Sequence, residues 1–261
     1  MRYSPRTEVK GGLNLTIATS YLISKNLQRL SQNQRNKTRI TVFLSEQFDT
    51  PIYSRLNAWF RGVYEPYTKS TVIMRAPAGN QKSWEFSKDY VQRHSLIEFD
   101  TIIFQLEDDY VCESDMLQDT IEFFASHNPC FVHPSDYPDR YTMPINDDDK
   151  HITVVAGRTR IWRSVTSSTV SYASRLRTLL AFADVLFQPK NDWSNSKLIR
   201  NLGGHATIFS AIPSHCAHLE ALFSNDGSLQ GVSLAPFYKD WWTMGQQALL
   251  EAQTYVSYPI I

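Results

Sequence analysis

The sequence predicts an α/β protein with a mostly parallel central sheet that is covered by helices on both faces. Short apolar runs rich in β-branched residues alternate with longer stretches in which apolar residues recur at helical spacing. Strands that alternate with helices of this length form βαβ units, which build parallel sheets. The composition agrees with a globular chain, because 42% of the 261 residues are hydrophobic and 20% are charged.

The first half of the chain carries the regular part of this pattern. Its predicted strands are residues 13–19, 39–44, 71–74 and 101–106. Its predicted helices are residues 21–32, 52–63 and 80–92. Right-handed crossovers place the carboxyl ends of parallel strands along one edge, and α/β proteins bind ligands at that edge. Polar residues that follow these strands are therefore candidates for a site.

The second half is less regular. A short strand is expected from residue 131, followed by a loop rich in proline and aromatic residues. Residues 151–156 and 160–165 predict a hairpin, which would form a small antiparallel addition to the sheet. Helices are expected at residues 171–186 and 194–202.

Charge is distributed unevenly along the chain, although 26 basic and 26 acidic residues sum to zero. Residues 1–97 hold 15 basic and 6 acidic side chains, residues 98–149 hold 1 and 14, and residues 150–261 hold 10 and 6. An acidic stretch is usually a solvated surface, but it can also form a cation site. The neutral balance of the whole chain argues against an obligate polyanionic partner.

The cysteines and the absence of long apolar runs indicate the cellular location that is expected for the protein. Cys112, Cys130 and Cys216 are odd in number and have no paired spacing, so we expect buried, reduced thiols. No apolar run reaches the roughly 18–20 residues that a membrane-spanning helix needs. The N-terminus lacks the apolar core of a signal peptide. A soluble, cytoplasmic protein is therefore expected.

The strongest candidate for a site is the run Glu107-Asp108-Asp109, which directly follows the predicted strand at residues 101–106. Three adjacent carboxylates repel one another, so burying them requires a compensating cation. Dense oxygen ligands suit Mg²⁺ or Mn²⁺. The alternative is an acidic turn whose charges favour the start of a helix near Ser114. The position at the predicted sheet edge favours the metal site.

Motifs of several other enzyme classes are missing from the sequence. No Gly-x-Gly-x-x-Gly follows the first predicted strand and no Gly-Lys-Ser/Thr loop occurs. Their absence disfavours a dinucleotide oxidoreductase and a P-loop nucleotidase. Gly-x-Ser-x-Gly is also absent, which disfavours an α/β-hydrolase.

Residues 104–110, Phe-Gln-Leu-Glu-Asp-Asp-Tyr, resemble the acidic motif of GT-A glycosyltransferases in its LEDDY form. Segments similar to bacterial and viral family-2-like members follow at residues 133–141, 161–164, 167–169 and 212–220. The resemblance spans residues 13–242. It implies a single GT-A (Rossmann-like) domain over residues 1–261, with a nucleotide-sugar-binding half at 1–110 and an acceptor-binding half at 111–261.

The resemblance implies a UDP- or GDP-type sugar nucleotide as the donor and Mn²⁺ or Mg²⁺ as the cofactor. It implies that contacts to the donor come from Thr19, Ser20, Glu46, Asp49, Asn80 and Glu107. Capping or turn chemistry is the alternative role for each of them. For the metal, Asp109 is the first candidate ligand, Asp108 the second and His218 a third from later in the chain. His205 and His215 are the alternatives to His218.

Catalysis by inversion requires a general base for the acceptor hydroxyl. The family position of this base corresponds to Asp192, which precedes a predicted helix and could equally be its N-terminal cap. Asp139 and Asp240 are the rival bases. Asp108 would contribute to catalysis through the metal, which neutralises the charge of the leaving nucleoside diphosphate.

These expectations describe a metal-dependent glycosyltransferase that moves a sugar to a hydroxyl of a glycan, a lipid-linked acceptor or another acceptor. Residues 137–141, Trp162, Trp241 and Trp242 would stack on the acceptor sugar, unless the tryptophans belong to the core. A nucleotidyltransferase is one alternative, although a Gly-rich basic loop after the first strand is missing. A non-catalytic carbohydrate- or nucleic-acid-binding protein is another, because the first third is basic. A nucleic-acid acceptor is also compatible with the sequence.

Overall fold

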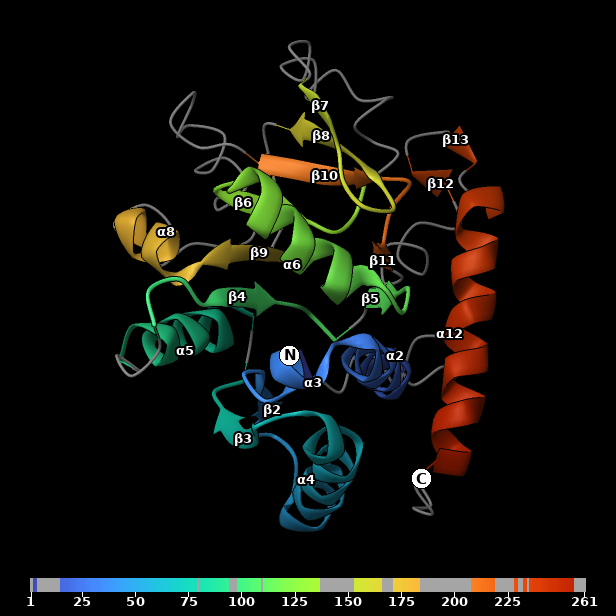
Figure 1. The fold of residues 1–261 in the computed structure, drawn as a ribbon. Helices are drawn as coiled ribbons and strands as arrows, with labels where there is room; N and C mark the ends of the chain where they lie inside the picture. The colour runs from blue at the N-terminus through green and yellow to red at the C-terminus, as the bar shows by residue number, and fades with distance from the viewer. Residues whose placement is uncertain are drawn as a thin grey trace. The chain divides into compact units, whose positions relative to one another are not determined.

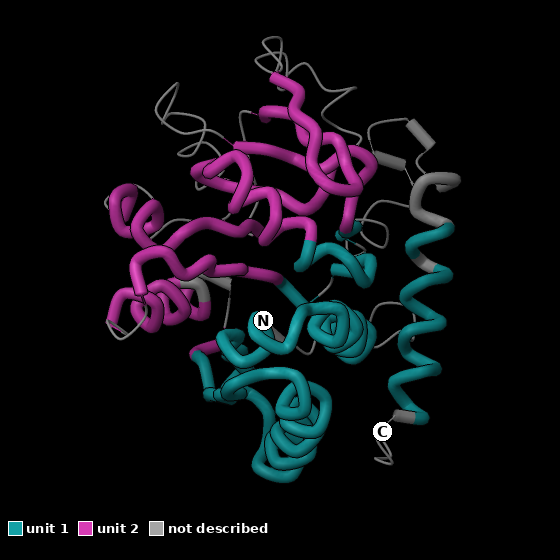
Figure 2. Tube along the Cα trace, in the orientation of Figure 1, with its two compact units in different colours: residues 1–76, 107–118, 216–261 teal, residues 77–106, 119–215 magenta. Residues whose placement is uncertain are grey.

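The computed structural model confirms the α/β class. The described residues are 2–3, 15–78, 80–93, 98–108, 110–136, 153–165, 171–183, 208–218, 228–229, 232–233 and 235–255. The chain forms two compact units, each assembled from separate stretches of sequence (Figure 2). Unit 1 consists of residues 1–76, 107–118 and 216–261, and unit 2 consists of residues 77–106 and 119–215.

The helices and strands follow one another along the chain as labelled in Figure 1. The helices are α2 (Leu15–Arg29), α3 (Gln32–Arg35), α4 (Thr50–Tyr64), the 3₁₀ turn η1 (Glu65–Tyr67), α5 (Asn80–Arg93), α6 (Met116–His127), α8 (Leu176–Ala181) and α12 (Ala235–Tyr255). The strands are β1 (Arg2–Tyr3), β2 (Arg39–Ser45), β3 (Ser70–Ala76), β4 (Ile102–Gln105), β5 (Tyr110–Cys112), β6 (Phe131–His133), β7 (Val154–Ala156), β8 (Ile161–Val165), β9 (Tyr172–Arg175), β10 (Ile208–Ile212), β11 (Cys216–His218), β12 (Ser228–Leu229) and β13 (Val232–Ser233). Among the described residues, none of these helices is long and apolar enough to cross a membrane.

Unit 1 contains a three-stranded sheet in the order β1-β2-β3, in which both pairs of neighbours are parallel. β2 and β3 match the strands predicted at residues 39–44 and 71–74, and they pair along their full length. α4 packs against both strands and buries Trp59, Phe60 and Val63. The apolar spacing that predicts this helix therefore corresponds to its buried face.

The strand predicted at residues 13–19 is wrong, because α2 begins at Leu15 and continues into the helix predicted at residues 21–32. The run Leu-Asn-Leu-Thr-Ile-Ala-Thr is rich in residues that favour strands. In the structure the hydroxyls of Thr16 and Thr19 are buried and bond to a distant segment, which sequence periodicity cannot reveal. Within unit 1, α2 lies alongside α12 and also packs against β5 and α4 (Figure 1).

Unit 2 contains a six-stranded sheet in the order β4-β9-β6-β10-β8-β7. Among these strands β6 and β10 are parallel neighbours, and the other four pairs are antiparallel. The predicted mostly parallel sheet is therefore wrong for the main sheet, which is mixed. Much of the difference comes from residues 171–186, for which the sequence predicts a helix. The first part of this segment is strand β9, which lies between β4 and β6 and is antiparallel to both. The hairpin predicted between residues 151 and 165 is confirmed as β7 and β8.

Two apolar clusters lie on the two faces of the six-stranded sheet. One consists of Phe131, Val165, Tyr172, Leu179 and Ile208. The other consists of Phe123, Phe124, Val132, Trp162, Ala173, Phe209 and Ala211. Neighbouring residues of a strand point to opposite faces, so β6, β9 and β10 each contribute to both clusters. Helix α8 supplies one side chain to the first cluster, and α6 supplies two side chains to the second. Each face of the sheet is therefore covered by a helix.

Candidate functional site

The acidic motif lies in unit 1, where helix α2 holds its second carboxylate. Asp108 is only 5% exposed, and Thr16 and Thr19 are fully buried. The Thr16 hydroxyl donates a hydrogen bond to Asp108 Oδ2 at 3.1 Å, and the Thr19 hydroxyl donates one to the main-chain oxygen of Asp108 at 3.1 Å. A carboxylate removed from water needs such donors, because its desolvation is otherwise costly. One helix therefore fixes both the side chain and the backbone of Asp108.

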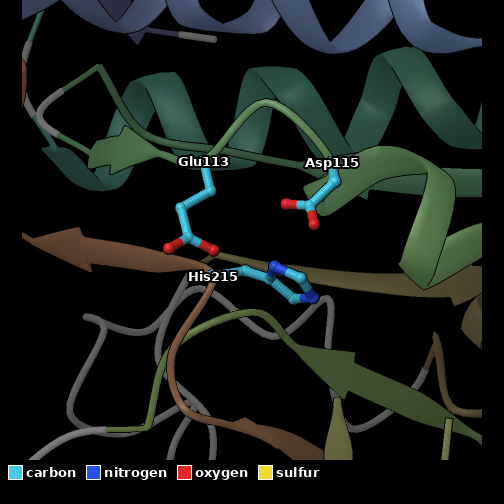
Figure 3. A group of neighbouring side chains, drawn as sticks. All are labelled: Glu113, Asp115 and His215. Atoms are coloured by element: carbon cyan, nitrogen blue, oxygen red, sulfur yellow. The ribbon is translucent and has the colours of Figure 1, made fainter. Parts of the chain in front are cut away.

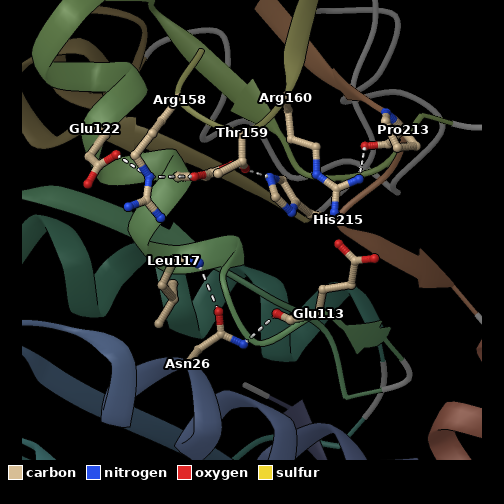
Figure 4. A network of polar contacts seen from close by, with 10 residues as sticks. Asn26, Glu113, Leu117, Glu122, Arg158, Thr159, Arg160, Pro213 and His215 are labelled. Atoms are coloured by element: carbon tan, nitrogen blue, oxygen red, sulfur yellow. Dashed lines mark hydrogen bonds and ion pairs between the residues drawn. The ribbon is translucent and has the colours of Figure 1, made fainter.

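A third residue of α2 anchors the segment that follows the motif. Asn26 Nδ2 donates to the carbonyl oxygen of Glu113 at 2.7 Å, and Asn26 Oδ1 accepts from the N–H of Leu117 at 2.9 Å (Figure 4). The Leu117 N–H belongs to the first turn of α6, where N–H groups have no partner within the helix. A single buried amide thus holds the turn between β5 and α6 in place.

Strand β5, which leads out of the motif, pairs with β11 in an antiparallel ladder that sets Tyr110 opposite His218. The two rings stack with their centroids 5.0 Å apart. His218, predicted to be a metal ligand, therefore lies on the strand next to the one that leaves the acidic motif. The sequence separates these two segments by more than 100 residues, so only the strand pairing brings them together.

Cys112 and Cys216 form a disulfide in the same ladder, where their Cα atoms are 4.1 Å apart. The expectation of reduced thiols is wrong for this pair, whereas Cys130 is a half-buried thiol. The two residues are separated by 104 positions, and only the antiparallel register places their side chains opposite one another. The disulfide covalently joins the strand that follows the motif to the strand that carries His218.

Two further carboxylates near the motif were not singled out by the sequence patterns. Glu113 and Asp115 project from the turn between β5 and α6 (Figure 3), and their carboxylate oxygens lie within 4.8 Å of each other. Both residues are half-buried. The sequence feature that contains Glu113 and Asp115 is the acidic stretch at residues 98–149. Acidic residues before a helix are common without any ligand, so this stretch does not single out the pair.

Thr19 and Ser20, predicted to contact the donor, are interior residues of a helix and do not end a strand. Ser20 is fully buried, and its hydroxyl donates to the carbonyl oxygen of Thr16 at 2.6 Å. Ser20 also hydrogen-bonds to the Tyr64 side chain. Burial raises the pKa of the Tyr64 hydroxyl, and the bond to Ser20 acts in the opposite direction.

Glu46 and Asp49 lie in the exposed stretch after β2. The N–H of Glu46 donates to the carbonyl oxygen of Ala76 at 2.8 Å, which ties this stretch to the end of β3. Asp49 is the N-cap of α4, because its Oδ1 accepts a hydrogen bond from the N–H of Ile52 at 2.8 Å. The capping alternative for Asp49 is therefore realised in the structure.

The remaining predicted residues fall in three different places. Asn80 is the first residue of α5, in unit 2. Glu107 is half-buried in unit 1, two residues after the end of β4. Asp109, the first candidate metal ligand, and Asp192, the candidate base, lie outside the described residues.

Unit 2 holds its own buried polar cluster around Asp119, in the first turn of α6. Asp119 is 1% exposed, accepts a hydrogen bond from the Thr159 hydroxyl, and has its Oδ2 3.2 Å from His215 Nε2. Arg158 Nε lies 3.4 Å from Asp119 Oδ1. It also lies 2.8 Å from Glu122 Oε2 (Figure 4). The loop between β7 and β8 thus supplies two partners of one carboxylate. His215, an alternative metal ligand in the sequence, packs against the same carboxylate.

A second buried charged group in unit 2 joins Arg163 of β8 to Asp136, which follows β6. Arg163 Nε and Nη2 donate to Asp136 Oδ1 at 3.0 and 2.8 Å, and the two side chains are 4% and 7% exposed. The N–H of Asp136 donates to the Ser214 hydroxyl at 2.6 Å. The aromatic residues 137–141, expected on the acceptor side, lie outside the described residues.

Trp162 belongs to the core of unit 2. It is fully buried and stacks on Phe123, with ring centroids 4.4 Å apart. Trp241 is buried on α12, and the side chain of Trp242 is outside the described part of the structure. The core alternative therefore holds for Trp162 and Trp241.

The described residues thus form an α/β protein with a mixed six-stranded sheet, a three-stranded parallel sheet and a buried aspartate, Asp108, that is held by α2. No protein-family model matches its sequence, and no curated protein sequence matches it either.

Proposed function

We propose that the protein is a metal-dependent glycosyltransferase that moves a sugar from a UDP- or GDP-type donor to an acceptor hydroxyl with inversion. The observation that carries this proposal is the burial of Asp108, within a run of three acidic residues, against hydroxyl donors of α2. An acidic turn that only favours a helix start would remain in water at no cost. Burial of the carboxylate favours a cation site over such a turn.

The parallel sheet of unit 1 supports a nucleotide-binding role. Its order, β3-β2-β1, is the order of the first half of a doubly wound nucleotide-binding sheet. Ligands of such sheets bind beyond the carboxyl ends of the strands. Glu46 follows β2 at that edge and is our candidate for contact with the base or ribose, whereas the carboxylate of Asp49 already caps α4.

The donor set fits Mg²⁺ or Mn²⁺, because both ions prefer carboxylate oxygens and Mn²⁺ also accepts imidazole. Asp108 and Asp109 would hold the ion, with His218 as the third ligand. The ion would neutralise charge on the departing nucleoside diphosphate. In this proposal Thr16 and Thr19 keep the Asp108 carboxylate and its backbone oriented, and Asp192 accepts the proton of the acceptor hydroxyl.

A cytoplasmic location is part of the proposal, and the disulfide bears on it. Cytosolic proteins seldom keep disulfides, since cellular thiols reduce them. Alkylation of the protein inside intact cells, before lysis, would reveal the oxidation state of Cys112 and Cys216 in its own compartment. Full alkylation of all three cysteines supports the cytoplasm, and protection of this pair contradicts it.

The test incubates purified protein with Mn²⁺ and a panel of nucleotide sugars and measures the released nucleotide. We expect release of UDP or GDP from at least one donor, and a loss of about 100-fold or more in Asp108→Asn. Asparagine keeps the size of the side chain and an acceptor oxygen while removing the charge. The matched control, Asp100→Asn, removes an exposed carboxylate that pairs with Arg177, and it should leave release unchanged.

The outcomes separate the alternatives. Release from no donor, together with no thermal shift by UDP or GDP in Mn²⁺, overturns the proposal. Formation of a nucleotide sugar from a sugar phosphate and a nucleoside triphosphate would identify a nucleotidyltransferase. Salt-dependent retention on nucleic acid, or retention on a glycan, without turnover would identify a binding protein.

A further inference from the structure

Resting on the proposed function, we infer that Thr16 is a positioning residue for the divalent cation. Its hydroxyl bonds to Asp108 Oδ2 and so sets the orientation of the carboxylate that would bind the ion. The inference concerns the second residue of α2, which carries no motif and was not among the residues predicted to contact the donor.

The hydroxyl bond of Thr16 differs from those that Ser20 and Ser24 donate in the same helix, whereas Thr19, like Thr16, reaches Asp108. The hydroxyls of Ser20 and Ser24 are also fully buried, but they bond to carbonyl oxygens of α2 itself, at 2.6 and 2.7 Å. These local bonds are the usual ones for serine and threonine within helices. Thr16 instead reaches a residue 92 positions away in the sequence.

This contact orients a negative charge without cancelling it. A hydroxyl fixes one carboxylate oxygen but brings no positive charge, so this contact does not itself weaken the attraction of the carboxylate for a cation. Thr19 fixes the main-chain oxygen of the same residue, so α2 restrains Asp108 at two points. Carboxylates that bind metals are characteristically held by such outer hydrogen bonds, and removing them lowers metal affinity by roughly 10- to 100-fold.

The test measures binding and does not depend on turnover. Thr16→Val removes the hydroxyl at nearly constant volume, Thr16→Ala removes it with a smaller side chain, and Thr16→Ser keeps it. Ser24→Ala is the matched control, because it removes a buried hydroxyl whose bond stays within α2. Free Mn²⁺ is followed by electron paramagnetic resonance, with and without UDP or GDP, and circular dichroism verifies that each variant is folded.

We expect Thr16→Val and Thr16→Ala to weaken Mn²⁺ binding by about 10- to 100-fold, and Thr16→Ser and Ser24→Ala to bind it as the wild type does. Unchanged Mn²⁺ affinity in the folded valine or alanine variant overturns the inference and leaves the proposed function in place. An equal loss in Ser24→Ala also overturns it, because the loss would then reflect helix packing. A wild-type protein that binds neither Mn²⁺ nor a nucleoside diphosphate with Mn²⁺ overturns both.

Discussion

Asp108 in unit 1 and Asp136 in unit 2 are both buried carboxylates, but different donors hold them. Asp136 accepts two hydrogen bonds from Arg163, whose guanidinium also brings a positive charge. Asp108 accepts a hydrogen bond from the neutral hydroxyl of Thr16. A guanidinium cancels the charge of its partner, whereas a hydroxyl only orients it. The first arrangement is suited to holding a fold together, and the second is compatible with the proposed cation site.

The contrast extends to other polar contacts of the two units. In unit 2, Arg158 forms ion pairs with the carboxylates of Asp119 and Glu122. In unit 1, the segment at residues 107–118 is held by threonine hydroxyls, the amide of Asn26 and a disulfide. Removing an ion-pair partner in unit 2 should therefore cost more than removing a neutral donor in unit 1.

The largest effect is expected for Arg163→Met, which leaves Asp136 buried without its counter-charge. Breaking a buried ion pair from one side costs about 3–5 kcal/mol of unfolding free energy. Urea unfolding measures the loss. The double variant Arg163→Met/Asp136→Leu should recover most of it, because an apolar pair replaces the charges. A loss below about 1 kcal/mol in the single variant would contradict the assignment of Asp136 as a structural carboxylate.

A somewhat smaller loss is expected when the Cys112–Cys216 disulfide of unit 1 is removed. The disulfide closes a loop of 104 residues. Disulfides typically contribute about 2–4 kcal/mol to the free energy of unfolding. Urea unfolding with and without dithiothreitol measures the difference. The variant Cys112→Ser/Cys216→Ser should unfold alike in both conditions. Alkylation of the purified protein, denatured without reductant, should modify Cys130 alone. Modification of all three cysteines in this purified sample would show that the disulfide is absent.

Gly157→Ala tests the loop that carries partners of Asp119 in unit 2. A Cβ atom at this position would collide with the buried indole of Trp162 and approach the carbonyl oxygen of Arg160 to 3.0 Å. Because the indole is fixed in the core, we expect a loss of about 1–3 kcal/mol in thermal unfolding. Gly62→Ala in α4 is the matched control. Its Cβ meets nothing within 4 Å, so helix propensity should make it neutral or stabilising by up to about 1 kcal/mol.

The smallest effect concerns the contact between α2 and α12 in unit 1. Hydrogen bonds from Gln247 and Tyr21, followed by the charge of Lys25, lower the pKa of Glu251 below its ordinary value of 4.5. A lowered folded-state pKa means that Glu251 stabilises the fold above pH 4.5 and loses this contribution as pH falls through its folded value. The contribution should stay below about 1 kcal/mol, since the group is near the surface.

The measurement for Glu251 is the difference in unfolding free energy between wild type and Glu251→Gln. This difference should be present at pH 7 and shrink as pH falls below 4.5. A difference that grows on acidification would mean that the folded state binds the proton more tightly than the unfolded state, contrary to the assigned hydrogen bonds. Glu65→Gln is the comparison variant for Glu251→Gln. It removes the charge of an exposed glutamate that pairs with Arg61 within one helical turn.

Sequence patterns predict some elements of this fold more accurately than others. Strands β2, β3 and β4 and helices α4 and α5 are predicted to within a few residues, because apolar periodicity and capping are local properties. The first part of helix α2 is missed because its threonines favour a strand locally. The residue to which their hydroxyls bond, Asp108, lies 92 and 89 positions later. Strand β9 is missed because its conformation depends on pairing with both β4 and β6.

The same holds for the candidate site, where some residues have a signal in the sequence and others have none. The acidic motif is visible as a run of carboxylates after an apolar strand, and Asp49 is recognisable as a cap. The threonine donors of Asp108, the nearby pair Glu113 and Asp115, and the disulfide have no comparable local signal. Each of them depends on which distant segment the chain brings alongside the motif.

By itself, the sequence determined the α/β class, most element boundaries of the first half and the position of the acidic motif, because local periodicity and runs of like residues specify these features. Only the tertiary structure decided that the main sheet is mixed, that Cys112 and Cys216 are joined, and that hydroxyls hold Asp108 while an arginine holds Asp136. The physical reason is that a buried polar group must find a partner, and a local pattern does not specify which distant residue will supply it.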